Sequence, residues 1–89
     1  MQQIEGFIWA DWVVDKLDWK HGVAPDEVEE TFFNPPYKVR RTKGDKYLLY
    51  GRSYDDRYLF VVFAWEGKHI KVISARDMTS SERRYFSRK

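Results

Sequence analysis

Two arginines stand at the ends of apolar segments of the chain and have the chemistry to bind phosphate. Arg52 follows the apolar stretch 47–50, and Arg76 follows the largely apolar stretch 70–75. The planar guanidinium group of arginine presents paired N–H donors that match the oxygens of a phosphate. If the two segments are strands that meet in suitable register, both arginines can line one anion site.

Side-chain alternation predicts which residues accompany each arginine, because residues two apart on a strand share a face. A different interpretation makes the arginines structural, in salt bridges with Glu82, Asp77 or acidic helices. The two interpretations are compatible, since a carboxylate can orient a functional arginine. The predicted face-sharing sets are Arg52 with Tyr50 and Leu48, and Arg76 with Ser74 and Val72.

The charges of the chain are divided between its two parts. Residues 1–36 contain eight acidic and two basic residues, whereas residues 37–89 contain fourteen basic and six acidic ones. Such asymmetry suggests a polyanionic partner for the basic part. The alternative is that acidic helices and basic strands simply neutralise each other.

Composition excludes several kinds of site. The 89 residues include no cysteine, which rules out disulfides, cysteine-based zinc sites and a thiol nucleophile. Two histidines without clustered carboxylates argue against a metal site, so neither a metal nor another cofactor is expected. We find no secretory signal and no apolar stretch of membrane-spanning length, and we therefore expect a cytoplasmic protein of one domain, residues 1–89.

The first part of the chain predicts a short strand and two helices. Residues 7–9 suit a strand, and the apolar spacing in 12–20 predicts a helix with Asp11 as its cap. Gly22 is placed to end that helix in a left-handed conformation. Pro25 suits the first position of a second helix, which Asn34 and the two prolines after it end.

The second part predicts a meander of antiparallel strands joined by short turns. The expected fold class is therefore α+β, with about four strands packed against N-terminal helices. We expect the apolar strand 57–65 to be central and covered on both faces. Thr79 and Glu82 match a capping box that opens a short C-terminal helix. The predicted strands are 37–42 at an edge, 46–53, 57–65 and 69–75.

Several short motifs, taken in order, make the chain resemble the BrnT-like toxin family. The resemblance runs from about Trp9 to the end of the chain. The motifs are Lys20-His21-Gly22-Val23, Phe32-Phe33-Asn34-Pro35, Leu49-Tyr50-Gly51-Arg52-Ser53, the strand 59–63, Ile73-Ser74-Ala75-Arg76-Asp77-Met78, and Glu82-Arg83-Arg84-Tyr85.

This resemblance implies a fold, an activity and a partner. BrnT-like proteins are toxins of type II toxin–antitoxin systems, share the fold of the RelE-type ribonucleases, and cut RNA without a metal. A DNA-binding antitoxin neutralises them, and a heterotetramer with that antitoxin is one possible assembly. The alternative that we keep open is a non-catalytic RNA- or protein-binding module of the same fold, acting in an antitoxin complex that represses transcription.

RNA cleavage through the 2′-hydroxyl needs groups that accept and donate protons and cations that stabilise the charged phosphate. We expect Arg52, Arg76 and Glu82 to be the catalytic residues, although the capping box alone would explain Glu82. Lys46, on the same face as Arg52 but roughly 20 Å along the strand, suits an RNA-backbone contact better than catalysis.

Further basic and aromatic residues are candidates for binding RNA. Histidine as a residue type can exchange protons near neutral pH, but His21 also suits a helix C-terminus. Tyr85 can stack on a base or pack in the core, and Arg40 and Arg41 can bind phosphate or protect an edge strand from aggregation. The RNA-binding candidates are Lys20, His21, Arg40, Arg41, Lys46, Arg83 and Tyr85.

Overall fold

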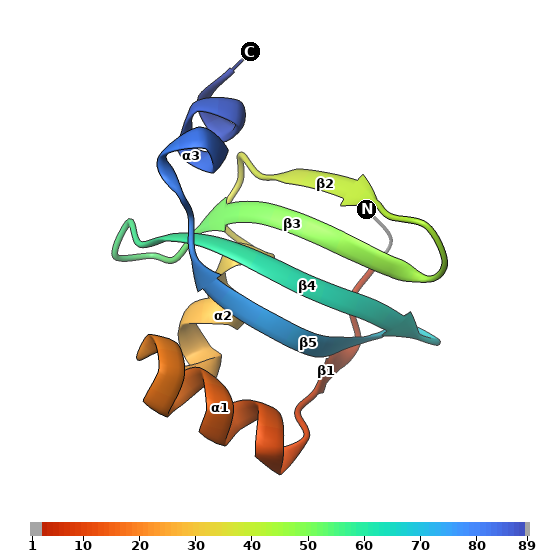
Figure 1. Cartoon of the computed structure of the whole chain (residues 1–89). Coiled ribbons are helices and arrows are strands. Elements are labelled where there is room, and N and C mark those ends of the chain that lie inside the picture. The colour runs from red at the N-terminus through yellow and green to blue at the C-terminus, as the bar shows by residue number, and fades with distance from the viewer. Residues whose placement is uncertain (1–2, 89) are drawn as a thin grey trace.

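A five-stranded sheet with the first two helices on one side forms the body of the computed structural model, which describes residues 3–88 (Figure 1). The fold class is α+β, as predicted. In chain order, the elements are β1 (Gly6–Ile8), α1 (Asp11–His21), α2 (Pro25–Thr31), β2 (Lys38–Arg41), β3 (Lys46–Arg52), β4 (Tyr58–Glu66), β5 (His69–Asp77) and α3 (Ser80–Ser87).

Strands β2 to β5 form the predicted antiparallel meander, and the strand order across the sheet is β1-β5-β4-β3-β2. The sheet has one strand more than the four expected, because β1 pairs with β5 in parallel. A parallel pair needs a long crossover connection, and here α1, α2 and the meander lie between the two strands. Strand β4 is central, as its apolar sequence predicts.

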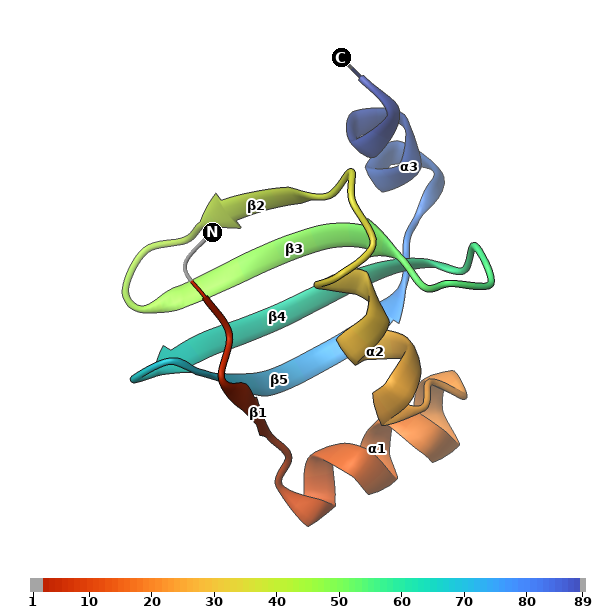
Figure 2. The same ribbon diagram turned by 180° about the vertical axis from the view of Figure 1, so that it is seen from behind.

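The core lies between the sheet and the first two helices, and we call this side the helical face. Figure 2 shows α2 in front of the strands and α1 beside it. From α1 and α2, Val13, Leu17 and Val28 are fully or almost fully buried against the sheet. The strand residues that complete this core are Leu49, Leu59, Val61, Phe63, Ile70, Val72 and Ala75.

The ends of the helices follow the local sequence, with two differences. Helix α2 ends at Thr31, with Phe32 as its C-cap, three residues before Asn34, where the sequence predicts its end. Gly22 ends α1 in the left-handed conformation, at φ 62°, and Pro25 opens α2. The prediction that Asp11 caps α1 is wrong, because the N-cap is Ala10 and Asp11 lies in the first helical turn. There its carboxylate still interacts favourably with the helix dipole. The capping box of α3 is present, with Thr79 and Glu82 bonding each other's backbone N–H groups.

The other side of the sheet, which we call the open face, is covered only in part. Along β4, Leu59, Val61 and Phe63 are buried, whereas Phe60 and Val62 on the opposite side are only half-buried. The expectation that β4 is covered on both faces is therefore wrong, because the helices that precede the meander all pack on the same side. Within residues 3–88, no helix is long and apolar enough to cross a membrane.

A β-bulge in β5 decides which side chains reach the open face. The register shifts between Val62 and Phe63, so that Val62 pairs with Ser74 while Phe63 pairs with Val72. The extra residue, Ile73, reverses the alternation that follows it. Arg76 therefore shares a face with Ser74, as predicted, but not with Val72, which is buried in the core on the helical face.

Candidate nucleic-acid interface

Cross-strand pairs arrange the side chains of the open face in rows, and four of these rows concern the predicted site. Row one pairs Arg52 with Tyr58 across β3 and β4. Row two runs through Lys38, Tyr50, Phe60 and Arg76, row three through Arg40, Leu48, Val62 and Ser74, and row four through Lys46, Ala64 and Lys71. We call rows one and two the aromatic rows, and rows three and four the aliphatic rows.

Arg76 is held in one orientation by contacts on two sides. Its Nη1 and Nη2 atoms donate to the two carboxylate oxygens of Glu82, at 2.8 and 2.9 Å, and Nη1 also donates to the carbonyl of Asp77. Its guanidinium carbon lies 4.5 Å from the centre of the Phe60 ring, which is a cation–π contact. Three of the five guanidinium donors are thus engaged. Among residues 3–88, no hydrogen bond engages Nε or the second N–H of Nη2, so one paired edge of the group can meet a phosphate.

The Arg76–Glu82 pair fixes the charge of both side chains. The hydrogen bond from Arg76 is the main cause that lowers the pKa of Glu82, and the same bond raises the pKa of Arg76, in each case against the opposing effect of burial. Glu82 is therefore ionised at neutral pH. An ionised carboxylate cannot donate a proton, which limits Glu82 to accepting one or to orienting Arg76.

Arg52 lies on the same open face, on the opposite side of β4 from Arg76. It pairs with Tyr58, two residues before the partner of Arg76, Phe60. Two strand spacings separate β3 from β5, which amounts to about 10 Å. An ion pair from Nη1 to Asp56, at 2.9 Å, holds its side chain. The register thus places both arginines on one face, as the prediction of a shared anion site requires.

Helix α3 adds aromatic and basic groups over the aromatic rows. The Tyr85 ring contacts the Tyr50 ring, with centroids 4.8 Å apart, and Lys38 lies 4.5 Å from the Tyr85 centroid and donates to its carbonyl. Arg40 also lies over Tyr85, at 5.5 Å. Arg83 lies 4.0 Å from the centre of the Tyr58 ring. Cations and rings are therefore interleaved at this end of the sheet.

The remaining predicted RNA-binding residues lie elsewhere. Lys46 is on the open face, but at the opposite end of β3 from Arg52. Arg41 pairs with Tyr47 and lies over its ring on the helical face. Lys20 and His21 belong to the last turn of α1, on the helical side of the sheet. The structure brings together Arg40, Arg52, Arg76, Glu82, Arg83 and Tyr85, but it does not bring Lys20, His21 and Arg41 to the same face.

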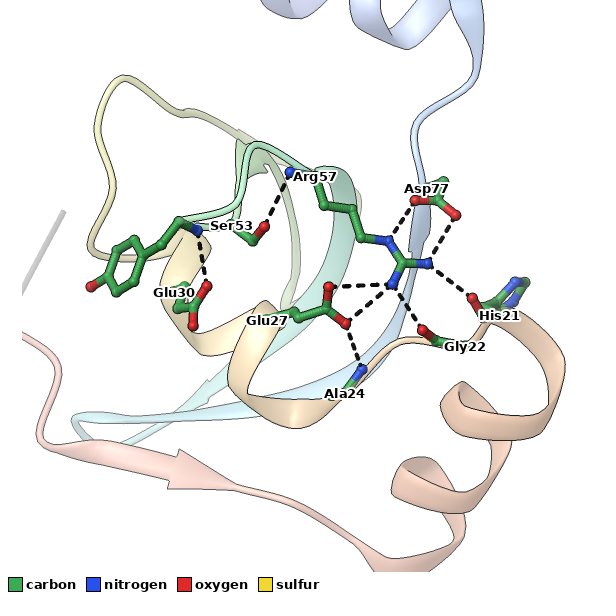
Figure 3. A network of polar contacts seen from close by, with 9 residues as sticks. His21, Gly22, Ala24, Glu27, Glu30, Ser53, Arg57 and Asp77 are labelled. Atoms are coloured by element: carbon green, nitrogen blue, oxygen red, sulfur yellow. Dashed lines mark hydrogen bonds and ion pairs between the residues drawn. The ribbon is translucent and has the colours of Figure 1, made fainter.

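A third arginine has a different environment, shown in Figure 3. Arg57 donates from Nε and Nη2 to the carboxylate of Asp77, at 2.8 and 3.0 Å, and from Nη1 to Glu27. The carbonyl oxygens of His21 and Gly22 accept the remaining N–H groups. Hydrogen bonding to Asp77 is the main cause that raises the pKa of Arg57 and lowers that of Asp77. All five donors are used, so Arg57 joins α1, α2 and β5 and is structural.

Sequence reasoning did not single out three residues that shape this region: Phe60, Lys38 as an anchor of α3, and Arg57. In the sequence, Phe60 is one of several apolar residues of a strand. Its contact with a cation follows only from its cross-strand pairing with Arg76. The alternation along β4 is the one signal that would have placed Phe60 opposite the buried residues Leu59 and Val61. Lys38 and Arg57 had no comparable signal, because their partners are 47 and 20 residues away in the sequence.

Metal ligands do not gather anywhere in the described part of the chain. Between residues 3 and 88, no group of three or more His, Asp or Glu side chains is placed to hold a metal ion. The chemistry that this region offers through its own side chains is cationic stabilisation of phosphate and stacking of aromatic rings on bases.

Comparison with known proteins identifies the family. The family model described as "Ribonuclease toxin, BrnT, of type II toxin-antitoxin system" matches residues 15–82, from α1 into α3. The chain belongs to the BrnT family of ribonuclease toxins. A search of curated proteins found no match.

A solved BrnT structure has the same fold. The crystal structure of the Brucella abortus ribonuclease toxin BrnT matches with a TM-score of 0.72 and 27% sequence identity, over 84% of this chain and 97% of that chain. Membership of the BrnT family makes this chain the toxin component of a type II system, which implies an antitoxin protein as its partner. The ribonuclease activity of the family agrees with the cations and rings of the open face.

Proposed function

We propose that this BrnT protein cleaves RNA, without a metal ion, at the aromatic rows of its open face. The observation that carries the proposal is the placement of Arg52 and Arg76 on one face, on either side of β4 and beside Tyr58 and Phe60. Arginine binds phosphate through paired hydrogen bonds, and aromatic rings stack on unpaired bases. The same end of the sheet thus offers contacts for both parts of a nucleotide.

The reaction that suits these groups is attack of the RNA 2′-hydroxyl on the neighbouring phosphorus. The 2′-oxygen loses a proton and bonds to phosphorus, while the bond to the 5′-oxygen breaks and that oxygen gains a proton. The products are a 2′,3′-cyclic phosphate and a free 5′-hydroxyl. Negative charge increases on the phosphate in the transition state, and a cation already fixed in place stabilises it without having to reorganise.

Arg76 is the principal phosphate ligand in this proposal. Its Nε and the second N–H of Nη2 form the edge of the guanidinium group that Glu82 leaves unused. Arg52, held by the exposed Asp56, contributes a second cation. Glu82 orients Arg76 and, as an ionised carboxylate, is the acceptor nearest to Arg76 for the 2′-hydroxyl proton.

RNA on either side of the cleaved bond is expected to contact α3 and the edge of β2. Tyr85 is half-buried, and one of its sides faces Lys38 and Arg40, so its ring offers a base a stacking surface with cations beside it. Arg83 adds a further cation. Lys46 lies far from the arginines and would contact only RNA that extends along β3.

We further propose that the antitoxin is a DNA-binding protein that neutralises the toxin in the cytoplasm, and that the two assemble as a heterotetramer. The basic open face supports neutralisation by direct cover, because an acidic segment there would exclude RNA. Light scattering of the purified complex measures its stoichiometry. A mass of two toxins and two antitoxins is expected, and a 1:1 complex would contradict the heterotetramer.

The decisive experiment measures cleavage of a fluorescent single-stranded RNA in excess EDTA. The parent is expected to cleave and to leave a 2′,3′-cyclic phosphate, with Arg76→Ala and Arg52→Ala strongly impaired. Lys16→Ala is the control, because it removes a cation on α1, across the sheet from the proposed site. Full activity in both arginine variants would refute the site. No cleavage by the parent, with antitoxin binding intact, would favour the non-catalytic binding module.

A further inference from the structure

The aliphatic rows of the open face differ in chemistry from the aromatic rows beside them. On the open side they present Leu48, Val62 and Ala64, which are all half-buried, and they contain no aromatic ring. Leu48 and Val62 are direct cross-strand partners, so their side chains form one continuous aliphatic surface. Unpaired bases are bound by stacking on rings, which these two rows lack.

Cations border this aliphatic surface on three strands. Arg40 on β2 pairs with Leu48, and Ala64 lies between Lys46 on β3 and Lys71 on β5. Lys71 is half-exposed and only 4.0 Å from Glu66, at the limit of an ion pair. Within residues 3–88 the side chain of Lys46 forms no ion pair at all. Three strands thus place positive charge around an apolar centre, with Glu66 as the acidic residue at the far end.

We infer that the aliphatic rows are the docking site of the antitoxin, through an amphipathic segment with acidic flanks. Its apolar side chains would cover Leu48 and Val62, and its carboxylates would pair with Arg40, Lys46 and Lys71. Desolvated apolar contact supplies most of the affinity at such interfaces, while complementary charge sets orientation and speeds association. Nucleic acid would gain the same charge contacts but no stacking partner, so a protein segment fits this surface better.

Docking there also explains how a partner could silence the toxin. Row three lies directly beside row two, so a segment on Leu48 and Val62 would lie next to Tyr50 and Phe60. Arg40 belongs to row three and also lies over the Tyr85 ring. The antitoxin would therefore engage a cation of the proposed RNA path and obstruct access to Arg76. The inference rests on the family's antitoxin partner and, for this competition alone, on the proposed function.

The test uses the full-length toxin and, as the probe, the protein encoded beside the toxin gene. Val62→Lys introduces a charge into the aliphatic surface but keeps the face basic, and we expect it to weaken binding at least about tenfold. Lys46→Glu combined with Lys71→Glu reverses two of the charges that border the aliphatic surface and changes no apolar side chain. We expect about tenfold weaker binding and a reduced dependence on salt.

Two controls match these variants. Val39→Lys changes an exposed valine of β2 on the other side of the sheet, and Lys16→Glu reverses a charge on α1. Both are expected to bind the probe as the parent does. Circular dichroism and urea unfolding of each variant show that weakened binding does not reflect loss of fold.

RNA cleavage by the free toxin, measured in parallel, separates this inference from the proposed function. Val62→Lys is expected to cleave RNA within about twofold of the parent while it escapes inhibition by the probe. Parent-like binding by both Val62→Lys and the double lysine variant would overturn the inference, as would failure of the parent to bind the probe. Loss of cleavage with unchanged binding would assign the aliphatic rows to RNA. A parent that binds but does not cleave would refute the ribonuclease proposal and leave the docking site standing.

Discussion

Arg57 and Arg76 are both paired with carboxylates and are similarly exposed, yet they use their N–H donors differently. Arg57 directs all five N–H donors to Asp77, Glu27 and two backbone carbonyls. Arg76 directs three donors to Glu82 and Asp77, and its planar face to Phe60. A salt bridge therefore does not by itself make an arginine structural. The number of donors left over, and the face of the sheet toward which they point, separate a fold-stabilising arginine from one that can bind a substrate.

The largest expected effect is on catalysis, from Arg76→Ala. Loss of a fixed cation that stabilises transition-state charge costs about 100-fold or more in rate. Its pair with Glu82 is partly exposed, so the free energy of unfolding should fall by less than about 1 kcal/mol. Cleavage rates and urea unfolding of the same preparation measure both quantities. Arg76→Lys, which keeps the charge but loses the paired donors, should be intermediate. If Arg76→Ala instead unfolded easily but retained the cleavage rate of the parent, Arg76 would be a structural arginine like Arg57.

The second effect is on stability, from Arg57→Ala. This substitution removes the Arg57 donors to Asp77, Glu27 and two carbonyl oxygens, and because these side chains are partly exposed we expect the free energy of unfolding to fall by about 1–2 kcal/mol. Urea denaturation monitored by tryptophan fluorescence measures the change. The rate of RNA cleavage by the folded protein should stay within a few-fold of the parent. If Arg57→Ala retained full stability but lost cleavage, the structural role assigned to Arg57 would be wrong.

A smaller effect is expected from Phe60→Leu. The substitution keeps an apolar side chain but removes the ring under Arg76, and a partly exposed cation–π contact contributes about 0.5–1 kcal/mol. We expect the RNA cleavage rate to fall about two- to fivefold. Phe60→Tyr retains the ring and should behave like the parent. If the contact with Arg76 is the whole contribution of Phe60, the double variant Phe60→Leu with Arg76→Ala should be no slower than Arg76→Ala alone, and a further loss would show that the ring also stacks on RNA.

The smallest effect concerns how the free energy of unfolding changes at acid pH. Hydrogen bonds from Arg57 and Arg76 lower the pKa values of Asp77 and Glu82, whose ordinary values are 3.8 and 4.5. A carboxylate with a lowered pKa stabilises the fold at neutral pH, and this contribution disappears as the pH falls through the lowered value. The free energy of unfolding should therefore decrease as the pH drops below about 4.5. Asp77→Asn and Glu82→Gln should each flatten that decrease. If both variants lost stability at acid pH in the same way as the parent does, neither ion pair would contribute to the pH dependence of folding.

Local sequence signals predicted most of the fold. Gly22, Pro25 and the Thr79–Glu82 capping box mark helix ends because their effects act within a few residues. The meander of β2 to β5 follows from short turns, which permit only antiparallel neighbours. The parallel pairing of β1 with β5 joins segments more than sixty residues apart in the sequence, as Phe7 and Ile70 are, and no local pattern specifies it.

For the candidate site, the sequence by itself determined the residue types and, for Arg52 but not for Arg76, which neighbours share its face of the sheet. Arg52 shares a face with Tyr50 and Leu48 because β3 alternates without interruption. For Arg76 the tertiary structure decided, since the bulge at Ile73 inserts one residue and moves Ser74 and Arg76 away from the face of Val72. A shift of one residue sends a side chain to the opposite side of a sheet. Without that bulge Arg76 would point toward the helical face, where Arg57 lies, and the open face would lack the arginine that we propose as its principal phosphate ligand.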